Sequence, residues 1–404
     1  MTPWVPVDSL GDRDFLEFRR RAIFECDKWD PQVGDVSVLA RHPLVLRSSA
    51  WDEVRQLAEA LAAETMAAEN EIASRPALHR RLGFPRTVRR ALARAAVAGP
   101  SAGTARIIRF DFHYTTDGWR ISEANTDVPG GLNEASGFAR LMAPHYPAAS
   151  IVGDPGAAFV DAVVSGAKPG GVVALVHATA YSDDQQMMTF VARALRTQGI
   201  DAHLASPAHV KWIDGRASLD AAWRRCSIDT IVRFFPAEWL PQLAADTAWK
   251  SYFAGGRTPL ANPATAILVQ SKRFPLIWDE LRTPLPTWRA LLPDTRDSRD
   301  VPWRSDASWV LKPALGRVGE GIGMADLIAP REWTRIRRAA TWWPSSWVAQ
   351  RRFSVAPLET ASGPVFPCLG VYTVDGRVVG AYGRLSTRPL IDSRAEDAAV
   401  LHAA

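Results

Sequence analysis

One short segment of the chain carries polar side chains whose types suit a metal or phosphate site: Arg109, Asp111, Glu123 and Asn125. They lie in two stretches, 107–114 and 119–125, in which polar and apolar residues alternate. Such alternation on both sides of a turn predicts a β-hairpin. A three-residue loop over 116–118, with Gly118 in the left-handed conformation, would place all of these polar side chains on one face of the hairpin.

In that register Asp111 lies opposite Glu123, and Arg109 lies opposite Asn125. Two facing carboxylates repel each other and weaken a hairpin unless a cation lies between them. Mg²⁺ prefers oxygen ligands and commonly uses one or two protein carboxylates. The segment therefore predicts a metal site made by Asp111, Glu123 and the amide oxygen of Asn125. The solvated polar face of an edge hairpin would show the same alternation and stands as the alternative on this segment alone.

A second segment with binding chemistry runs over 310–324 and reads VLKPALGRVGEGIGM. It places Lys312 at the end of an expected strand and follows it with closely spaced glycines: Gly316, Gly319, Gly321 and Gly323. Glycines let backbone amides approach a ligand, and amides beside a lysine suit phosphate oxygens. The spacing matches neither a P-loop nor a dinucleotide fingerprint, and a flexible surface turn would show the same glycines.

A second lysine changes this balance. Lys272 ends the stretch NPATAILVQSK. Two lysines and a glycine loop for phosphates, together with oxygen ligands for a metal, are the components that a Mg-ATP site requires. The combination favours a nucleotide site over a surface turn.

These segments resemble the synthetase domain of the glutathionylspermidine synthases, which are ATP-grasp carboxylate–amine ligases. The hairpin reads RFD and then EAN, with a glutamate twelve residues after the aspartate, as in that family. NPATAILVQSK and LKPALGRVGEG resemble its nucleotide-binding segments, and YGRLS resembles its strand with a second active-site arginine. The resemblance implies an α/β ATP-grasp fold, and the order of the motifs implies the circularly permuted branch.

The resemblance also assigns roles to single residues. Arg109 and Arg384 would be catalytic, and the hairpin oxygens would hold Mg²⁺. The residues expected to bind ATP are Lys272, Lys312, Gly316, Arg317, Gly319, Gly321 and Gln350. The stretch RFFPAEW offers Arg233 and Glu238 to the amine substrate, although a surface glutamate fits the sequence equally well. The stretch VPGGLNEAS replaces the glutathione-contacting segment of the family, so the acid substrate stays open.

The expected elements divide the chain into three parts. Residues 1–150 hold N-terminal helices and the metal-binding hairpin of the ATP-grasp core. Residues 151–260 alternate strands with a helix, which predicts an inserted small parallel-sheet substrate domain of the pre-ATP-grasp kind. Residues 261–404 form the nucleotide-binding part with a glycine-rich lid loop and a second hairpin.

Composition limits the remaining function classes. A chain of 404 residues with 47% hydrophobic and 23% charged residues is a globular protein with room for several packed units. The net charge of +5 comes from basic and acidic residues spread along the chain, which argues against a nucleic-acid partner, and the basic run 79–95 fits a solvated helix face. Neither a signal peptide nor a membrane span is evident, and the scattered Cys26, Cys226 and Cys368 suggest free thiols in the cytoplasm.

The resemblance implies a Mg-dependent ligase that uses ATP to join a small carboxylate to an amine. The reaction would pass through an acyl phosphate and release ADP and phosphate. Phosphoryl transfer needs charge neutralisation more than covalent help, which suits the lysines and carboxylates of the site. The alternative is a catalytically inactive ATP-grasp protein that binds nucleotide as a regulator or scaffold.

Overall fold

A central antiparallel sheet joins the two expected hairpins. The structure, a computed structural model, describes residues 2–34, 36–98, 105–254, 256–316 and 321–404. The central sheet has the order β21-β20-β19-β5-β6, with β18 paired to β19. Its strands are β5 (Ile107–Thr115), β6 (Gly118–Asn125), β18 (Leu358–Thr360), β19 (Gly363–Val374), β20 (Arg377–Ser386) and β21 (Glu396–Ala398). Because β5 pairs with β19, the first and third of the expected parts share one sheet.

The pairing predicted for the first hairpin is confirmed, but the backbone reaches it by another route. Asp111 lies opposite Glu123 and Arg109 opposite Asn125, as expected. Thr115 pairs with Gly118, so the turn is one residue shorter than the expected loop. The register then shifts between Asp111 and Phe112, where Ser122 is the extra residue of a β-bulge. The shorter turn and the bulge compensate each other, and Gly118 has the positive φ (+89°) that the turn requires.

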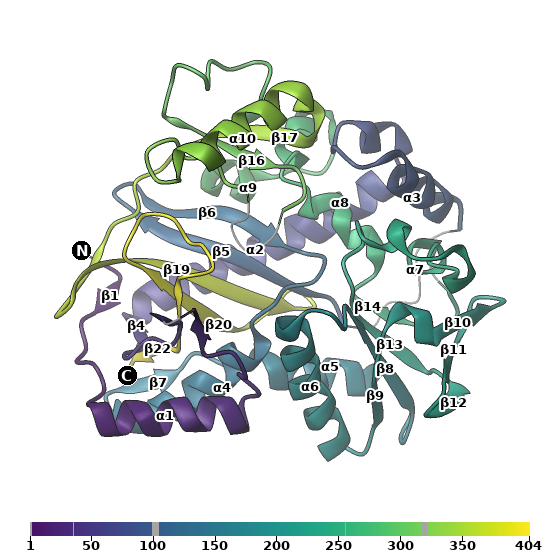
Figure 1. Cartoon of the computed structure of the whole chain (residues 1–404), viewed down its shortest axis with the longest axis horizontal. Helices are drawn as coiled ribbons and strands as arrows, with labels where there is room; N and C mark the ends of the chain where they lie inside the picture. Colours follow the sequence, from purple (N-terminus) through teal and green to yellow (C-terminus); the bar gives the residue numbers. More distant parts are fainter. Residues whose placement is uncertain (1, 35, 99–104, 255, 317–320) are drawn as a thin grey trace.

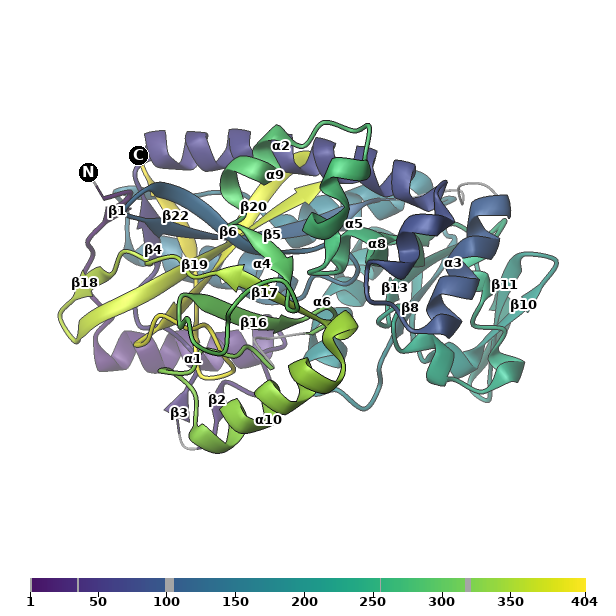
Figure 2. The ribbon, with the colours of Figure 1, turned by 90° about the horizontal axis from the view of Figure 1, so that it is seen from above.

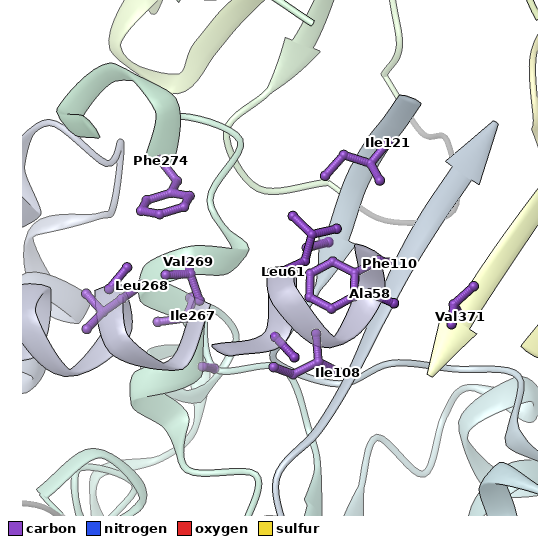
Figure 3. Packing of buried hydrophobic residues seen from close by; sticks show 14 of the residues in the cluster. Ala58, Leu61, Ile108, Phe110, Ile121, Ile267, Leu268, Val269, Phe274 and Val371 are labelled. Atoms are coloured by element: carbon purple, nitrogen blue, oxygen red, sulfur yellow. The ribbon is translucent and has the colours of Figure 1, made fainter. Parts of the chain in front are cut away.

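The apolar face of this hairpin packs against helices. The long helix α2 (Ser48–Ala73), rich in strong helix formers, runs along one face of the central sheet (Figures 1 and 2). Figure 3 shows Leu61 of α2 beside Phe110 and Ile108 of the hairpin, with α8 (Ile267–Gln270) next to them. Since side chains alternate along a strand, burying Ile108 and Phe110 turns Arg109 and Asp111 to the other face.

A parallel sheet forms a second region of the molecule, at the lower right of Figure 1. Its order is β14-β13-β8-β9, and every pairing in it is parallel. The strands are β8 (Val172–His177), β9 (Asp201–Ala205), β13 (Thr230–Phe234) and β14 (Leu260–Ala261), with α5 (Pro155–Gly166) and α6 (Ser182–Thr197) beside them. The strand–helix–strand pattern predicted from sequence is confirmed.

An antiparallel sheet follows β9 and was not predicted. It consists of β10 (Val210–Ile213), β11 (Arg216–Ala221) and β12 (Arg224–Ser227). Its outer strand β12 carries mostly exposed polar residues, so the alternation that marks a half-buried strand is missing there.

The sheet that we call the third sheet, after the central and the parallel sheets, lies above the first hairpin in Figure 1 and carries nucleotide-site candidates. Its order is β15-β17-β16, and its pairings are antiparallel. The elements are β15 (Thr295–Asp297), β16 (Trp309–Pro313) and β17 (Trp347–Arg351), with α9 (Pro286–Leu291) and α10 (Pro330–Trp342) nearby. Leu311 of β16 and Ile336 of α10 are buried in one cluster, which fixes the sheet against the helix.

Strands from both ends of the chain form a fourth sheet. It has the order β1-β4-β22-β7 and consists of β1 (Trp4–Val5), β4 (Leu44–Leu46), β22 (Val400–Ala403) and β7 (Ala149–Ile151). Beside it α1 (Asp12–Glu25) packs on α4 (Leu132–Met142), where the rings of Phe18 and Phe138 are 5.3 Å apart. A small ribbon, β2 (Gln32–Val33) with β3 (Val36–Ser37), follows α1. This packing brings residues after α1 toward the centre of the molecule.

The basic run forms the solvated helix face that was predicted. Within α3 (Arg86–Ala98), Val88 and Leu92 are buried while Arg90 and Arg94 are exposed. The remaining short helix of this region is α7 (Ser251–Ala254). Across the described part of the chain, no helix combines the length and the apolar character needed to cross a bilayer.

Candidate active site

A cavity of about 390 Å³ lies where the first hairpin, the third sheet, α4 and strands β19 and β20 meet. Its wall contains most of the residues that the sequence predicted for the site: Arg109, Asp111, Glu123, Asn125, Glu238, Lys312, Gly316, Gln350 and Arg384. Residues from all three expected parts of the chain therefore face one space.

On the polar face of the hairpin, Arg109 and Asp111 form a two-pronged ion pair. Arg109 donates from Nε and Nη2 to the two oxygens of Asp111 at 2.7 and 2.9 Å, and from Nη1 to the carbonyl of Gly130 at 2.8 Å. Asn125 Nδ2 donates to Asp111 at 3.1 Å. Burial disfavours the charge of Arg109, but Asp111 outweighs that effect and raises its pKa above the usual value. Both oxygens of Asp111 are thus engaged by the protein.

The other carboxylate of the hairpin meets the two predicted lysines. Lys272 Nζ lies 3.0 Å from Glu123 Oε2 and donates to the carbonyl of Gly316 at 3.1 Å. Lys312 Nζ donates to the carbonyl of Ser122 at 3.0 Å. Burial alone would raise the pKa of Glu123, but Lys272 and Lys312 overcome it and lower the pKa to about 2. Lys272 is not itself among the lining residues, but it reaches the wall through Glu123, and we call Asp111, Glu123, Lys272 and Lys312 the lysine end of the cavity.

The positive charge of Lys312 is only partly compensated by its surroundings. Burial, opposed by Glu123 and reinforced by Lys272, lowers the pKa of Lys312 to about 8. The same surroundings affect His113, since burial and the nearby Lys312 lower its pKa to about 4 and keep the imidazole neutral at pH 7. An anion bound at this end would relieve the repulsion between the lysines.

Different elements deliver these groups. Lys272 follows α8, and its backbone N–H donates to the carbonyl of Ala314, which ties it to the end of β16. Lys312 lies on β16, and Gln350 on the paired strand β17 donates from Nε2 to Thr295 Oγ1 at 3.0 Å. The nucleotide candidates are therefore positioned by the third sheet.

The glycine loop is only partly placed. Gly316 is in the cavity wall, whereas Gly321, with a φ of +72°, is not among its lining residues. The predicted contacts of Arg317 and Gly319 lie outside the described residues.

Arg233 is not brought to the cavity, contrary to the expectation that it contacts substrate. It lies on β13, pairs with Asp127 and is 1% exposed. Its guanidinium also donates to the backbone carbonyls of Phe235, Asn262 and Pro263. A buried guanidinium needs this many partners to offset its lost hydration, so the structure gives Arg233 a structural position. The sequence alone does not indicate whether the side chain of an arginine within a buried strand points to the cavity or to the interior of the protein.

Glu238 is in the cavity wall, which also contains Asp30, Asp183 and Asp184. Partial burial and the neighbouring Asp30 raise the pKa of Asp183 to about 6. Close carboxylates favour the approach of a cation.

Other residues of the wall were missed by sequence reasoning and meet around Asp397. Lys28 Nζ lies 2.8 Å from Glu134 Oε1 and 3.0 Å from Asp397 Oδ2. Tyr382 donates its hydroxyl to Asp397 at 2.5 Å, and Arg384 Nε lies 3.9 Å from the same carboxylate. We call this group, with all its members in the cavity wall, the balanced end: Lys28, Glu134, Tyr382, Arg384 and Asp397. Arg384 was predicted, and Tyr382 lies in the same stretch YGRLS. Glu134 carried a signal because it belongs to the divergent stretch VPGGLNEAS, whereas Lys28 and Asp397 carried none.

The oxygen atoms of the hairpin side chains are suitable ligands for Mg²⁺. Two carboxylates and an amide oxygen on one strand pair are hard oxygen ligands, and all of them line the cavity. Among the described residues, no cluster of three or more His, Cys, Asp or Glu side chains could hold a metal. A magnesium ion that shares its remaining positions with phosphates and water does not need such a cluster.

Comparison with solved structures supports the fold. A glutathione synthetase-like effector from Globodera pallida, solved in its apo form, superimposes with a TM-score of 0.66 over 99% of each chain at 12% identity. A putative γ-glutamylcysteine synthetase from Methylobacillus flagellatus gives a TM-score of 0.44 at 13% identity, over 81% of this chain and 88% of that chain. None of the curated proteins matches the sequence. The first likeness shows that this chain has the mixed α/β fold of an ATP-grasp protein.

The family comparison extends over nearly the whole chain. The family model for glutathionylspermidine synthase preATP-grasp proteins matches residues 41–398, which include the hairpin, both lysines and Arg384. This match supports carboxylate–amine ligase chemistry. The chain belongs to the glutathionylspermidine synthase preATP-grasp family.

Proposed function

We propose that this protein is a Mg-dependent ligase that uses ATP to join a small carboxylate to an amine through an acyl phosphate. One observation carries the proposal: Lys272 and Lys312 come from separate segments and converge on the hairpin beside one cavity, Lys272 at the carboxylate of Glu123 and Lys312 at the carbonyl of the preceding residue, Ser122. Cations for phosphates beside carboxylates for a metal are the equipment of phosphoryl transfer.

The lysine end would bind the nucleotide and its metal. Lys272 and Lys312 would contact phosphates, and the rest of the proposed nucleotide set is Gly316, Arg317, Gly319, Gly321 and Gln350. Asp111, Glu123 and Asn125 would hold Mg²⁺, which when bound neutralises charge on the phosphate oxygens. Arg109 forms an ion pair with Asp111, and Lys272 forms one with Glu123. When Mg-ATP binds, both cations would leave their carboxylates and contact phosphate instead.

The remaining residues suit an acyl-phosphate reaction. An oxygen of the substrate carboxylate attacks the γ-phosphorus of ATP, the bond to the β,γ-bridging oxygen breaks, and ADP leaves. The amine nitrogen then attacks the acyl carbon, loses a proton and displaces phosphate. Arg109 and Arg384 are proposed to bind the carboxylate or the transferring group with their planar guanidinium groups. Glu238, whose side chain is also in the cavity wall, would attract a cationic amine.

Further points of the proposal rest on chain order and composition. The metal hairpin precedes both lysines, which supports the circularly permuted form of the fold. The parallel sheet and its helices extend from α5 to β14, which supports a division near residues 150 and 260. Cys26, Cys226 and Cys368 are free thiols, which supports a cytoplasmic location. The partners would be a small-molecule acid and amine, without nucleic acid or membrane.

Calorimetric titration tests the nucleotide site first. Mg-ATP is titrated into the wild type, into Lys312→Met, and into Lys168→Met, whose side chain is 81% exposed. We expect binding to weaken about 100-fold in Lys312→Met, or roughly 2.7 kcal/mol, and to be unchanged in the control. Wild-type protein that does not bind Mg-ATP would refute the proposal.

Release of ADP then separates a ligase from an inactive nucleotide-binding protein. Pooled amino acids, short peptides and polyamines are added with Mg-ATP, and ADP is measured. A ligase releases ADP only when acid and amine are both present. A protein that binds Mg-ATP and releases none with any pool would instead support the regulatory or scaffold alternative.

A further inference from the structure

The balanced end differs in charge from the lysine end of the same cavity. Lys28 and Arg384 carry two formal positive charges, and Glu134 and Asp397 carry two negative ones. The group is therefore neutral as a whole but presents both signs. A ligand that carries only one charge would leave it unbalanced, whereas a ligand with one charge of each sign would not.

Two atoms of the balanced end are buried without a hydrogen bond to any described residue. One is Glu134 Oε2, an acceptor, and the other is Arg384 Nε, a donor. Glu134 is 7% exposed, and its other carboxylate oxygen is taken by Lys28. Arg384 donates from Nη2 to the carbonyl of Asp392, and its Nε lies too far from Asp397 for a hydrogen bond. Because an unpaired buried polar atom destabilises the protein, a ligand that pairs with both atoms would be favoured at this site.

The two atoms call for complementary ligand groups. Glu134 Oε2 requires a donor, and an ammonium is the strongest donor to a carboxylate. Arg384 Nε requires an acceptor, for which a carboxylate is suited. The α-ammonium and α-carboxylate of an amino acid are such a pair on one carbon atom.

The balanced end also adjoins the reacting groups. The guanidinium carbon of Arg109 lies 5.7 Å from the ring centre of Tyr382, whose hydroxyl contacts Asp397. Gly130, whose carbonyl holds Arg109, precedes Glu134 in the stretch VPGGLNEAS. A small molecule with its head at Glu134 would therefore extend a second carboxylate toward Arg109.

We propose that the balanced end recognises the zwitterionic head of an amino-acid-type acid substrate, with its ammonium at Glu134 and its carboxylate at Arg384. Of the two arginines proposed to bind a substrate carboxylate, Arg384 then holds the carboxylate of the head and Arg109 the reacting one. The inference rests on the proposed ligase function and names the class of acid. Glu134 is then a specificity-determining residue. Lys28, which precedes the family match at residue 41, orients Glu134 through their ion pair.

The test compares matched probe pairs that differ only in the ammonium group. The zwitterions are L-aspartate, L-glutamate and L-2-aminoadipate, and the matched acids are succinate, glutarate and adipate. Each is titrated calorimetrically into the full chain, with and without Mg²⁺ and the β,γ-imido analogue of ATP. We expect the zwitterion of at least one pair to bind about tenfold or more tightly than its matched acid.

Substitution of Glu134 then tests whether this residue causes the preference for the zwitterion over its matched acid. Glu134→Gln keeps the shape of the side chain and removes its charge, so the preference should fall to about one while nucleotide affinity is retained. Glu396→Gln, on the same strand as Asp397 but outside the cavity wall, is the control and should keep the preference.

Each outcome decides one question. If no pair shows a preference for the zwitterion, or if the preference survives Glu134→Gln, the balanced end is a structural ion cluster and the inference is overturned. If the nucleotide analogue does not bind, the proposed function fails. The titrations without nucleotide still judge the head site in that case, so the two failures are distinguishable.

Discussion

Two buried lysines in the wall of one cavity, Lys28 and Lys312, have pKa values shifted in opposite directions. Burial lowers the pKa of Lys28, but Asp397 and Glu134 more than reverse this, and its pKa lies well above the usual value. Lys312 is also buried, and among the described residues its ammonium donates only to a backbone carbonyl. Burial and the nearby Lys272 together lower its pKa to about 8, although Glu123 opposes them. The ion-pair partners account for the difference, because both side chains are withdrawn from water.

The contrast separates charges that stabilise the fold from charges that await a ligand. Lys28 joins carboxylates from α4 and β21, elements that are distant in the chain, and so holds one end of the cavity together. The positive charge of Lys312 is poorly compensated, and an anion bound beside it would stabilise that charge. Perturbed lysines of the second kind are candidates for function.

Removing charge from the lysine end should have the largest effect. In Glu123→Gln the metal loses a carboxylate and Lys272 loses its partner, so ADP formation should fall by about 1000-fold or more, roughly 4 kcal/mol. ADP release with an active acid and amine pool measures it. Asp117→Asn, at the exposed turn of the same hairpin, is the control. Activity within a few-fold of wild type in Glu123→Gln would remove this residue from the site.

The two lysines should differ in what they contribute to stability. Lys28→Met leaves two buried carboxylates without their cation, and we expect the free energy of unfolding to drop by about 3 kcal/mol. Lys312→Met removes a poorly compensated charge and should leave stability unchanged or slightly higher at pH 7. Urea denaturation of both variants measures the difference. If both lost equal stability, the contrast between the two ends would be wrong.

Lys272 should control access of the metal to Glu123. In Lys272→Met the carboxylate is released, so Mn²⁺ alone should bind about tenfold more tightly than to wild type, whereas the nucleotide should bind about tenfold more weakly. Electron paramagnetic resonance of free Mn²⁺ and calorimetry report the two affinities. Changes of the same sign in both would contradict an exchange of partners at Lys272.

The smallest expected effect is in pH dependence. Lys312 is protonated below its pKa of about 8 and loses its charge as pH rises through that value. Nucleotide affinity of the wild type should therefore fall about fourfold between pH 7 and 8.5, following the protonated fraction. Lys312→Arg stays protonated in this range and should remove most of the fall. A wild-type profile that is flat over this range would argue against the lowered pKa.

Local patterns in the sequence were sufficient to predict the hairpin and the pairing of its polar residues. Alternation and a turn glycine determined that Asp111 faces Glu123, because register in a hairpin depends on neighbouring residues alone. The same locality explains why the strands of the parallel sheet and the position of Lys312 at the end of β16 were predicted correctly. Even here the turn and the bulge at Ser122 were missed, since their shifts cancel in the final pairing.

Contacts between distant segments were decided only by the tertiary structure. Lys28 reaches Glu134 because α1 packs on α4, and no periodic pattern in the sequence links these residues. Arg233 turned out to be a buried partner of Asp127 for the same reason, because the neighbours of a strand residue come from elsewhere in the chain. Local sequence sets which groups a strand presents, whereas long-range packing sets which charges they meet, and those charges determine whether a residue stabilises the fold or serves the site.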